Sequence, residues 1–289
     1  MFNQYVPPAY IEKLIHSAKG TELKTERREM SVLFADIRNF TTLSEQFTPE
    51  ELSDFLKEYL TQATGIIFEN KGTIDKYVGD MVMAFWNAPL EDADHALNAV
   101  VSALNIITLT ETLTPIFLAK KWPAIRVGIG ISTGDMVVGD MGSNYRKAYT
   151  VLGDAVNLGS RIESLTKYYG VDILITNSTY NAILSKGIIC RKIDKIRVKG
   201  QKAVVDVYEP LGFNHQLDDM TLKVLDMHHD ALNKYLAGNW QESQALFIKL
   251  KQNTYLSTII YDIYLARIET MANKQNIKDW DGVYSHESK

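Results

Sequence analysis

Two stretches decide the fold: Ser31–Thr41 (SVLFADIRNFT) and Ile74–Trp86 (IDKYVGDMVMAFW). The apolar run in the first stretch predicts a buried strand that ends at Asp36. In the second stretch, two strand-like runs flank Gly79-Asp80, which predicts a β-hairpin with this dipeptide at its tip. Each stretch therefore delivers one carboxylate at a chain reversal.

A lone aspartate at a turn is usually a turn former. Asp36 and Asp80 are harder to interpret in this way, because the runs beside both are too apolar for a surface. Two carboxylates about 4 Å apart repel by roughly 4 kcal/mol at an effective dielectric constant near 20, so such a pair needs a cation between them. Oxygen ligands favour Mg²⁺ or Mn²⁺ over zinc. Two acids, a divalent ion and a nucleotide phosphate form a recurring catalytic set.

The bulk composition is that of an ordinary globular protein, with 46% hydrophobic and 23% charged residues in a chain of 289. The net charge of −4 gives no electrostatic case for nucleic acid as a partner. The single cysteine, Cys190, excludes an intrachain disulfide. No apolar run approaches the roughly 18 residues that span a bilayer, and the N-terminus lacks a signal-peptide pattern. We expect a soluble, cytoplasmic chain.

Helices and strands are mixed along the sequence. The pattern Thr48–Glu51 is a capping box with proline at the first helical position, and it predicts an amphipathic helix that ends near Asn70. Ile125–Ile131 alternates as a strand, and Thr133–Asp135 is expected to turn this strand into another one. Because hairpins join several strands, we predict an α+β fold with a mixed or antiparallel sheet flanked by helices.

We divide the chain into three regions: an N-terminal linker or helix (1–28), a main domain (29–210) and a helical C-terminal extension (211–289). In the extension, a helix, a Gly-Asn-Trp turn and a second helix resemble one tetratricopeptide-like hairpin. We expect a small helical appendage that packs on the main domain or on a partner.

Four motifs occur in the order and spacing of one known family: FADIRNFT (34–41), DKYVGD (75–80), RVGIGISTGDMVVGDMG (126–142) and YTVLGDAVNLGSRIE (149–163). Residues 29–210 resemble the catalytic domain of class III nucleotidyl cyclases, the adenylate and guanylate cyclase family. The resemblance implies a ferredoxin-like, palm-like core. It also implies attack of the ribose 3′-hydroxyl on the α-phosphorus of a nucleoside triphosphate, which yields a 3′,5′-cyclic monophosphate and pyrophosphate.

The resemblance carries over residue by residue to the chemistry of the site. Asn157 and Arg161 are four residues apart, so they share one face of a helix. The alternative for this pair is an exposed polar face without a role in chemistry. In the implied site, two Mg²⁺ or Mn²⁺ ions are bound by Asp36, Asp80 and the carbonyl of Ile37, and the phosphates are bound by Arg126 and Lys199. Asn157 and Arg161 act on the ribose and the transition state, and Lys76 and Thr150 bind the base.

Base choice depends on two positions. Lys76 stands where adenylate cyclases carry lysine and guanylate cyclases carry glutamate; a lysine only donates, so it matches the N1 acceptor of adenine. Thr150 stands where many adenylate cyclases carry aspartate. At this position the chain resembles a bacterial subgroup that has threonine there and that includes bicarbonate-responsive enzymes. A hydroxyl accepts from the adenine amino group more weakly than a carboxylate does. We expect ATP as substrate with some acceptance of GTP, and treat bicarbonate sensitivity as a hypothesis.

In this family the metal-binding acids and the base-binding residues of one site come from opposite subunits. This chain carries both sets, which predicts a two-fold homodimer with two equivalent sites. The N-terminal segment is similar to the linker that precedes the catalytic domain in bacterial receptor cyclases, so an upstream sensor or membrane domain is one expectation. The other is a surface helix that caps the domain.

Three alternatives keep a related fold. One is a catalytically inactive nucleotide-binding domain with a regulatory or scaffold role, and another is a guanylate cyclase, against which Lys76 argues. The third is a diguanylate cyclase. Those enzymes carry a Gly-Gly-acid-acid-aromatic signature at the hairpin tip, where this chain has Val78–Met81 (VGDM).

Overall fold

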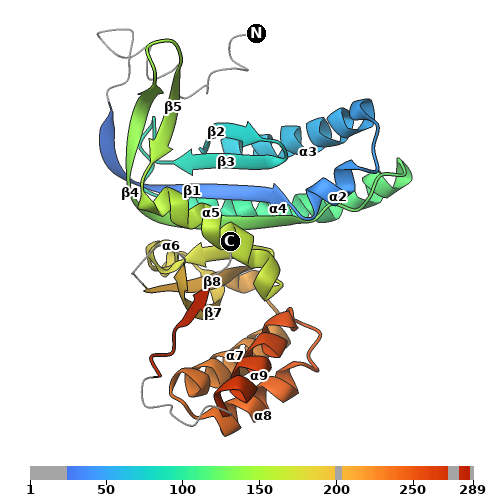
Figure 1. Cartoon of the computed structure of the whole chain (residues 1–289), viewed down its shortest axis with the longest axis vertical. Coiled ribbons are helices and arrows are strands. Elements are labelled where there is room, and N and C mark those ends of the chain that lie inside the picture. Colours follow the sequence, from blue (N-terminus) through green and yellow to red (C-terminus); the bar gives the residue numbers. More distant parts are fainter. Residues whose placement is uncertain (1–24, 199–203, 273–279, 287–289) are drawn as a thin grey trace.

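The computed structural model describes residues 25–198, 204–272 and 280–286. Within these ranges, nine strands form one mixed sheet in the order β2-β3-β1-β4-β6-β8-β7-β9, with β5 paired to β4 (Figure 1). The strands are β1 Glu26–Ile37, β2 Thr73–Val78, β3 Met81–Trp86, β4 Val127–Gly142, β5 Lys147–Leu152, β6 Ile173–Thr176, β7 Ile188–Val198, β8 Val204–Phe213 and β9 Tyr284–His286. The helices are α2 Phe40–Ser44, α3 Pro49–Glu69, α4 His95–Ala119, α5 Asp154–Tyr169, α6 Asn177–Ile183, α7 Asp219–Leu236, α8 Trp240–Leu250 and α9 Ile259–Ala272, with a 3₁₀ turn at Asn214–Gln216.

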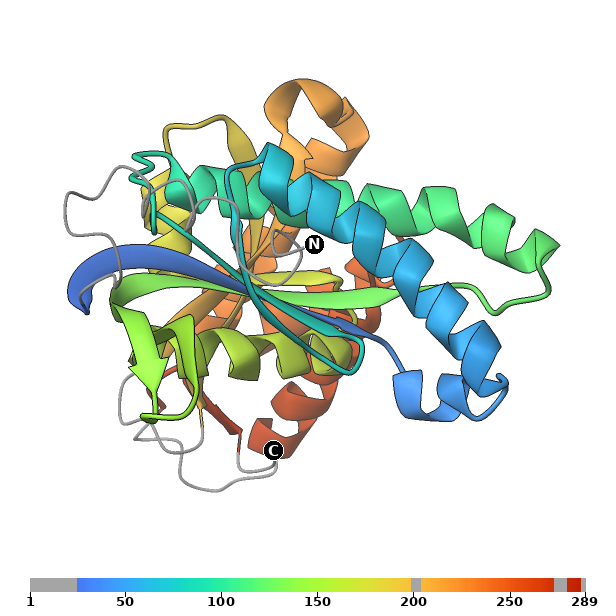
Figure 2. The same ribbon diagram turned by 90° about the horizontal axis from the view of Figure 1, so that it is seen from above.

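The predicted α+β fold with a mixed sheet flanked by helices is confirmed. Strand β1 pairs antiparallel with β3 and β4, while β4 and β6 are parallel. Helices α3 and α4 lie side by side on one face of the sheet and α5 lies on the other (Figure 2). Alternate residues of β1 enter both layers: Leu33 joins the cluster beneath α3 and α4, whereas Phe34 joins the cluster on the opposite face. The strand is therefore buried on both sides, as its apolar run predicts.

The start of α3 follows its sequence signal closely. Thr48 accepts a hydrogen bond from the Glu51 amide (3.2 Å), and the Thr48 amide donates to the Glu51 carboxylate (2.9 Å). Pro49 takes the first helical position, where no amide hydrogen is needed. The predicted capping box is thus confirmed, and α3 ends at Glu69 with Asn70 as its C-cap.

The turn predicted at Thr133–Asp135 is wrong. Strand β4 runs without interruption from Val127 to Gly142, and through this segment it stays paired with β1, with Met30 opposite Gly134 and Glu29 opposite Asp135. The reversal comes later, between β4 and β5, which pair through Val137–Leu152 and Gly142–Lys147. A long β1 offers ladder partners along the whole segment, and this pairing overrides the local turn preference of Thr-Gly-Asp.

Helix α5 crosses the sheet at unusually short range. A Cβ atom on Gly130 of β4 would lie 2.4 Å from the Gly159 carbonyl oxygen and 2.4 Å from the Glu163 amide nitrogen. A Cβ on Gly159 would lie 3.2 Å from the side chains of Val32 and Phe34 of β1. The two glycines therefore let the α5 backbone approach β1 and β4 directly. This contact fixes the helix that carries Asn157 and Arg161.

The C-terminal helices α7, α8 and α9 pack together at the end of the molecule opposite the β4–β5 hairpin (Figure 1). They share one apolar cluster with α5, β6, β7 and β8. Strand β9, which the sequence did not suggest, pairs parallel with β7. The predicted N-terminal linker lies outside the described residues up to residue 24. The boundaries after 28 and 210 stay predictions, and β8 runs through residue 210 to Phe213.

In the described part of the chain, α4 is long and apolar enough to cross a membrane, by length and composition alone. The expectation that no segment is apolar over a membrane-spanning length is therefore wrong for α4. Core helices of soluble proteins pass the same test. Ala99, Val100, Ala103 and Ile106 of α4 are fully buried in the cluster shared with α3 and the sheet.

Candidate active site

The two acids singled out in the sequence meet at one end of the sheet. Asp36 lies near the end of β1, opposite Gly128 of β4, and Asp80 lies at the tip of the β2–β3 hairpin. Gly79 has a φ of 64°, which the tight reversal between the strands requires. Because β3 pairs with β1, the hairpin tip is carried to Asp36, and the two carboxyl groups are in hydrogen-bond contact. The Ile37 amide donates to Asp80 at 2.9 Å.

Burial and crowding perturb this pair. Burial first, and then the hydrogen bond and the charge of Asp80, raise the pKa of Asp36 to about 7, with a further contribution from the charge of Glu163; a backbone hydrogen bond from Ile37 opposes the shift. Asp80 is only 9% exposed. Below about pH 7, the pair therefore holds a proton, which a bound cation would displace.

The donor chemistry at this position suits a hard divalent ion, since every atom on offer is an oxygen. Nowhere in the described ranges do three or more His, Cys, Asp or Glu side chains gather as a metal-ligand group. An ion between Asp36 and Asp80 would therefore complete its coordination with a backbone carbonyl, such as that of Ile37, which follows Asp36 in the chain, and with oxygens of a bound substrate or water. Such a shared set is typical of sites that bind Mg²⁺ together with a phosphate.

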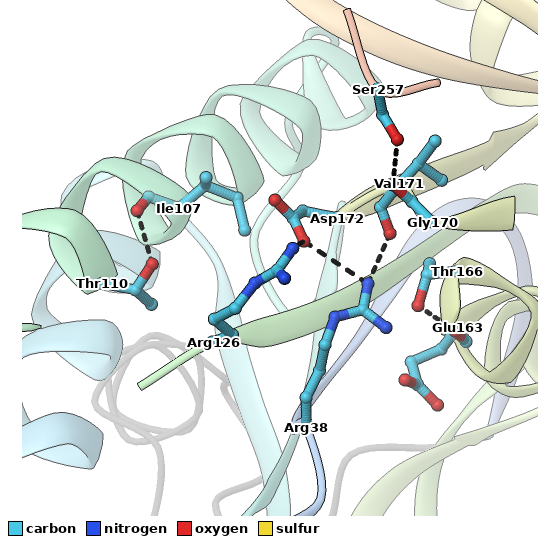
Figure 3. A network of polar contacts seen from close by, with 10 residues as sticks. All are labelled: Arg38, Ile107, Thr110, Arg126, Glu163, Thr166, Gly170, Val171, Asp172 and Ser257. Atoms are coloured by element: carbon cyan, nitrogen blue, oxygen red, sulfur yellow. Dashed lines mark hydrogen bonds and ion pairs between the residues drawn. The ribbon is translucent and has the colours of Figure 1, made fainter. Parts of the chain in front are cut away.

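Two arginines, Arg38 and Arg126, converge on one aspartate, Asp172 (Figure 3). Arg126 lies one residue before β4 and is 3.1 Å from Asp172, with 68% of its side chain exposed. Arg38 follows β1, donates to the Val171 carbonyl and lies 3.5 Å from Asp172. The backbone amide of Arg38 also donates to the Arg126 carbonyl at 2.8 Å. The predicted phosphate ligand Arg126 therefore lies at the strand end where Val127 pairs with Ile37, and Asp172 neutralises it.

A third acid, Glu163 of α5, stands close to this group and was missed in the sequence. Burial raises its pKa to about 7. Its carboxylate lies against Gly128, where a Cβ atom would be 2.9 Å from Glu163 Oε1. Gly128 pairs with Asp36, so Glu163 adds negative potential behind the acid pair. Glu163 is the last residue of the motif YTVLGDAVNLGSRIE, and this position was the sequence signal that could have identified it.

The base-binding candidates form a second group between β2 and β5. Thr150 donates its hydroxyl to Asp75 Oδ2 at 2.5 Å, and Lys76 Nζ lies 3.0 Å from Asp75 Oδ1. The structure thus brings Lys76 and Thr150 together, as required of residues that read one base, through an aspartate that the sequence analysis did not single out. Asp75 and Asp80 are five residues apart, so about 17 Å of extended strand at most separates this group from the acid pair.

Asn157 and Arg161 lie on the first two turns of α5, the former exposed and the latter half-buried. Within the described ranges, neither side chain has a hydrogen bond or an ion pair, which leaves both available to another molecule. Lys199, the second predicted phosphate ligand, lies outside the described residues.

Fold and site define a class of protein. Residues 23–209 match the model of the adenylate and guanylate cyclase catalytic domain, and the chain belongs to this family. Catalytic domains of this family generally use divalent metal ions, in line with the acid pair.

Among curated relatives, the chain is 35% identical over 211 residues to adenylate cyclase 1 of Rhizobium meliloti and 38% identical over 211 residues to an adenylate cyclase of Anabaena cylindrica. These matches cover 73% and 72% of this chain but only 32% and 40% of the relatives.

Among solved structures, the adenylyl cyclase CyaB from P. aeruginosa is 35% identical with a TM-score of 0.62, and covers 68% of this chain and 100% of that one. The guanylyl cyclase Cya2 is 30% identical with the same TM-score, and covers 68% of this chain and 98% of its own. Both structures share the fold of this chain, but one is an adenylyl cyclase and the other is a guanylyl cyclase. The fold alone therefore does not determine which base is bound.

Proposed function

We propose that this chain is an adenylate cyclase that converts ATP to 3′,5′-cyclic AMP and pyrophosphate at two sites shared across a homodimer. The observation that carries the proposal is that one chain holds both an acid pair, Asp36 with Asp80, and a separate base-binding group, Lys76 with Thr150. The two named adenylate cyclases among the relatives support it. The chain spans less than half of each of these relatives, so the activity is inferred for the domain itself.

In the proposed site, Asp36, Asp80 and the Ile37 carbonyl would hold two Mg²⁺ or Mn²⁺ ions. When bound, such ions lower the pKa of the ribose 3′-hydroxyl and neutralise the phosphates. Arg126 would bind the triphosphate after it leaves Asp172, and Lys199 would assist. The exposure of Arg126 supports this role, because a phosphate can reach its guanidinium from solvent.

Asn157 and Arg161 would act from the partner copy. They are spaced to present an amide and a guanidinium on one helical face. The amide would orient the ribose, and the guanidinium would stabilise the charge that grows on the α-phosphate as pyrophosphate leaves. Their lack of partners within the described chain supports contact with a substrate that is held by another subunit.

Adenine would be selected by two hydrogen bonds. Lys76 donates to N1 of adenine, whereas guanine presents an N1–H donor that a lysine cannot accept from. Thr150 accepts from the exocyclic amino group. The proximity of both side chains to one carboxylate supports a joint role.

The test is an assay of the purified chain with ATP or GTP and with Mg²⁺ or Mn²⁺, in which mass spectrometry identifies the product. We expect cyclic AMP from ATP and less cyclic GMP from GTP. Absence of any cyclic nucleotide would favour the inactive scaffold, and dominant cyclic GMP would favour a guanylate cyclase. A parallel series with bicarbonate at constant pH tests the proposed likeness to the bicarbonate-responsive subgroup, for which we expect a rise in cyclic AMP.

We further propose a cytoplasmic location and coupling to an upstream sensor or membrane domain. The greater length of the relatives supports additional domains in proteins of this kind.

A further inference from the structure

We propose that Asp75 is the residue that sets the preference for adenine, because it holds the Thr150 hydroxyl as a hydrogen-bond acceptor toward the base. This inference rests on the proposed function of the site and goes beyond it in naming a specificity-determining residue. Asp75 is a positioning residue, since it acts on the base through Thr150.

The position of Asp75 follows from an irregularity in β2. Adjacent residues of a regular strand point to opposite faces of the sheet. In β2 the register shifts between Ile74, which pairs with Ala84, and Lys76, which pairs with Met83, so that Asp75 is the extra residue of a β-bulge. A bulge re-aims side chains and is frequent beside active sites. This one allows Asp75 and Lys76, although neighbours, to meet each other.

The carboxylate of Asp75 is buried, and each of its two oxygens faces one of the base-binding candidates. Its side chain is 1% exposed, while that of Lys76 is 50% exposed. Oδ2 accepts the hydrogen bond from Thr150 at 2.5 Å, and Oδ1 faces the Lys76 ammonium at 3.0 Å, at an angle that falls short of hydrogen-bond geometry. One buried carboxylate therefore connects both side chains that are proposed to read the base.

This contact decides the polarity of Thr150. A hydroxyl has one proton to donate and two lone pairs. Because the Thr150 proton is given to Asp75, only the lone pairs remain for a ligand. Adenine offers its amino group as a donor at this position, whereas guanine offers the O6 acceptor. Thr150 then attracts adenine and repels guanine, and Lys76 discriminates in the same sense at N1.

A carboxylate in this role also explains how threonine can stand where many adenylate cyclases carry aspartate. The negative charge is not missing from the pocket but lies behind the hydroxyl, which it polarises. Hydrogen bonds with an ionised partner are about twice as strong as neutral ones. Asp75 thus restores part of the acceptor strength that a lone threonine lacks.

Asp75→Asn is the decisive substitution because it keeps the shape and changes the polarity. Lys76 only donates, so it will draw the new amide oxygen to its side and leave the NH₂ group against Thr150. Thr150 must then accept from Asn and turn its proton toward the base, which suits O6 of guanine. We expect the ratio of kcat/KM for ATP to that for GTP to fall by about tenfold or more, which corresponds to about 1.4 kcal/mol.

The measurement uses the full chain with Mn²⁺ and both nucleotides, and in parallel the Kd values of 3′-deoxy-ATP and 3′-deoxy-GTP, which lack the attacking hydroxyl. The matched control is Asp54→Asn, a loss of one exposed carboxylate on α3, which should leave both ratios unchanged. In a Thr150→Val background, Asp75→Asn should change the ratios less than threefold. Ratios do not depend on the fraction of folded protein, so partial misfolding does not mimic the effect.

A proportional loss with both nucleotides at an unchanged ratio would overturn the proposal and reduce Asp75 to a structural role. An equal fall of the ratio in the Thr150→Val background would also overturn it, because Asp75 would then act on the base without Thr150. A wild-type chain that binds both deoxynucleotides but forms no cyclic product would refute the proposed activity only, and the Kd ratio would still decide the role of Asp75. Failure to bind either nucleotide would refute both.

Discussion

The ion pair between Asp194 of β7 and Arg267 of α9 should be the strongest single polar link between the sheet and the C-terminal helices. Asp194 is fully buried and Arg267 is 7% exposed, and Arg267 Nη1 donates to Asp194 Oδ2 at 2.6 Å. The same oxygen accepts from the Tyr169 hydroxyl at 2.6 Å, at the end of α5. Burial alone would lower the pKa of Arg267, but the charge of Asp194 more than offsets it, so this pKa lies above its usual value.

The perturbation is Asp194→Asn, which removes the charge and keeps the size. It leaves a buried guanidinium whose Nε and Nη2 atoms have no hydrogen-bond partner in the described structure. The rings of Tyr284 and Tyr264, whose centroids lie 3.6 Å and 5.3 Å from Arg267 Cζ, do not replace the lost negative charge. Breaking one half of a buried pair typically costs about 3–5 kcal/mol. For a chain of this size we expect Tm to fall by roughly 10 °C.

The assay is denaturant unfolding followed by circular dichroism, with a thermal melt as a second readout. The double variant Asp194→Asn with Arg267→Met should regain most of the loss, because no buried charge remains. Arg27→Met, which breaks the exposed Arg27–Asp135 pair (2.8 Å, side chains 74% and 58% exposed), is the control and should cost no more than about 1 kcal/mol. If Asp194→Asn costs as little as this control, or the double variant is no better than the single one, the reasoning is refuted.

Three further outcomes are expected. Mixing Asp36→Ala protein with Arg161→Ala protein should restore about a quarter of wild-type cyclase activity, because half of the dimers are mixed and each mixed dimer has one complete site out of two. Activity no higher than that of the separate variants would argue against shared sites. Mn²⁺ affinity, measured by calorimetry, should fall by up to about tenfold per pH unit below the Asp36 pKa of about 7, because the ion must displace a proton. The affinity should level off above this pKa. A flat profile from pH 5 to 8 would contradict proton displacement. Asp172→Asn should lower KM for ATP by up to about fivefold at low ionic strength, because it removes an exposed competitor for Arg126; an unchanged KM would show that the carboxylate does not compete with phosphate.

The parts of the fold that local patterns determine were predictable from the sequence. The capping box at Thr48 and the hairpin at Gly79-Asp80 depend on neighbouring residues, and both were located correctly. The path of β4 was not, since Thr133–Asp135 has the composition of a turn and only pairing with β1 holds it extended. Strand β9 is three residues long and exists by pairing with β7, about 90 residues earlier in the chain.

The same distinction holds for the candidate site. Asp36 and Asp80 could be singled out because each ends an apolar run, and their convergence follows from the hairpin that joins β2 and β3. Asp75 could not be, since its meaning comes from Thr150, which is 75 positions away. Asp172 was missed for a similar reason: nothing in its own neighbourhood shows that Arg126 will reach it.

The short segment from Gly170 to Asp172 is held from three directions at once. Ser257, ahead of α9, donates to the Gly170 carbonyl at 2.7 Å; Arg38 at the end of β1 donates to Val171; Arg126 at the start of β4 pairs with Asp172 (Figure 3). The segment thus connects the C-terminal helices to the arginine proposed to hold the triphosphate. A displacement of Ser257 would therefore have to be taken up within these three residues or passed on to Arg38 and Arg126.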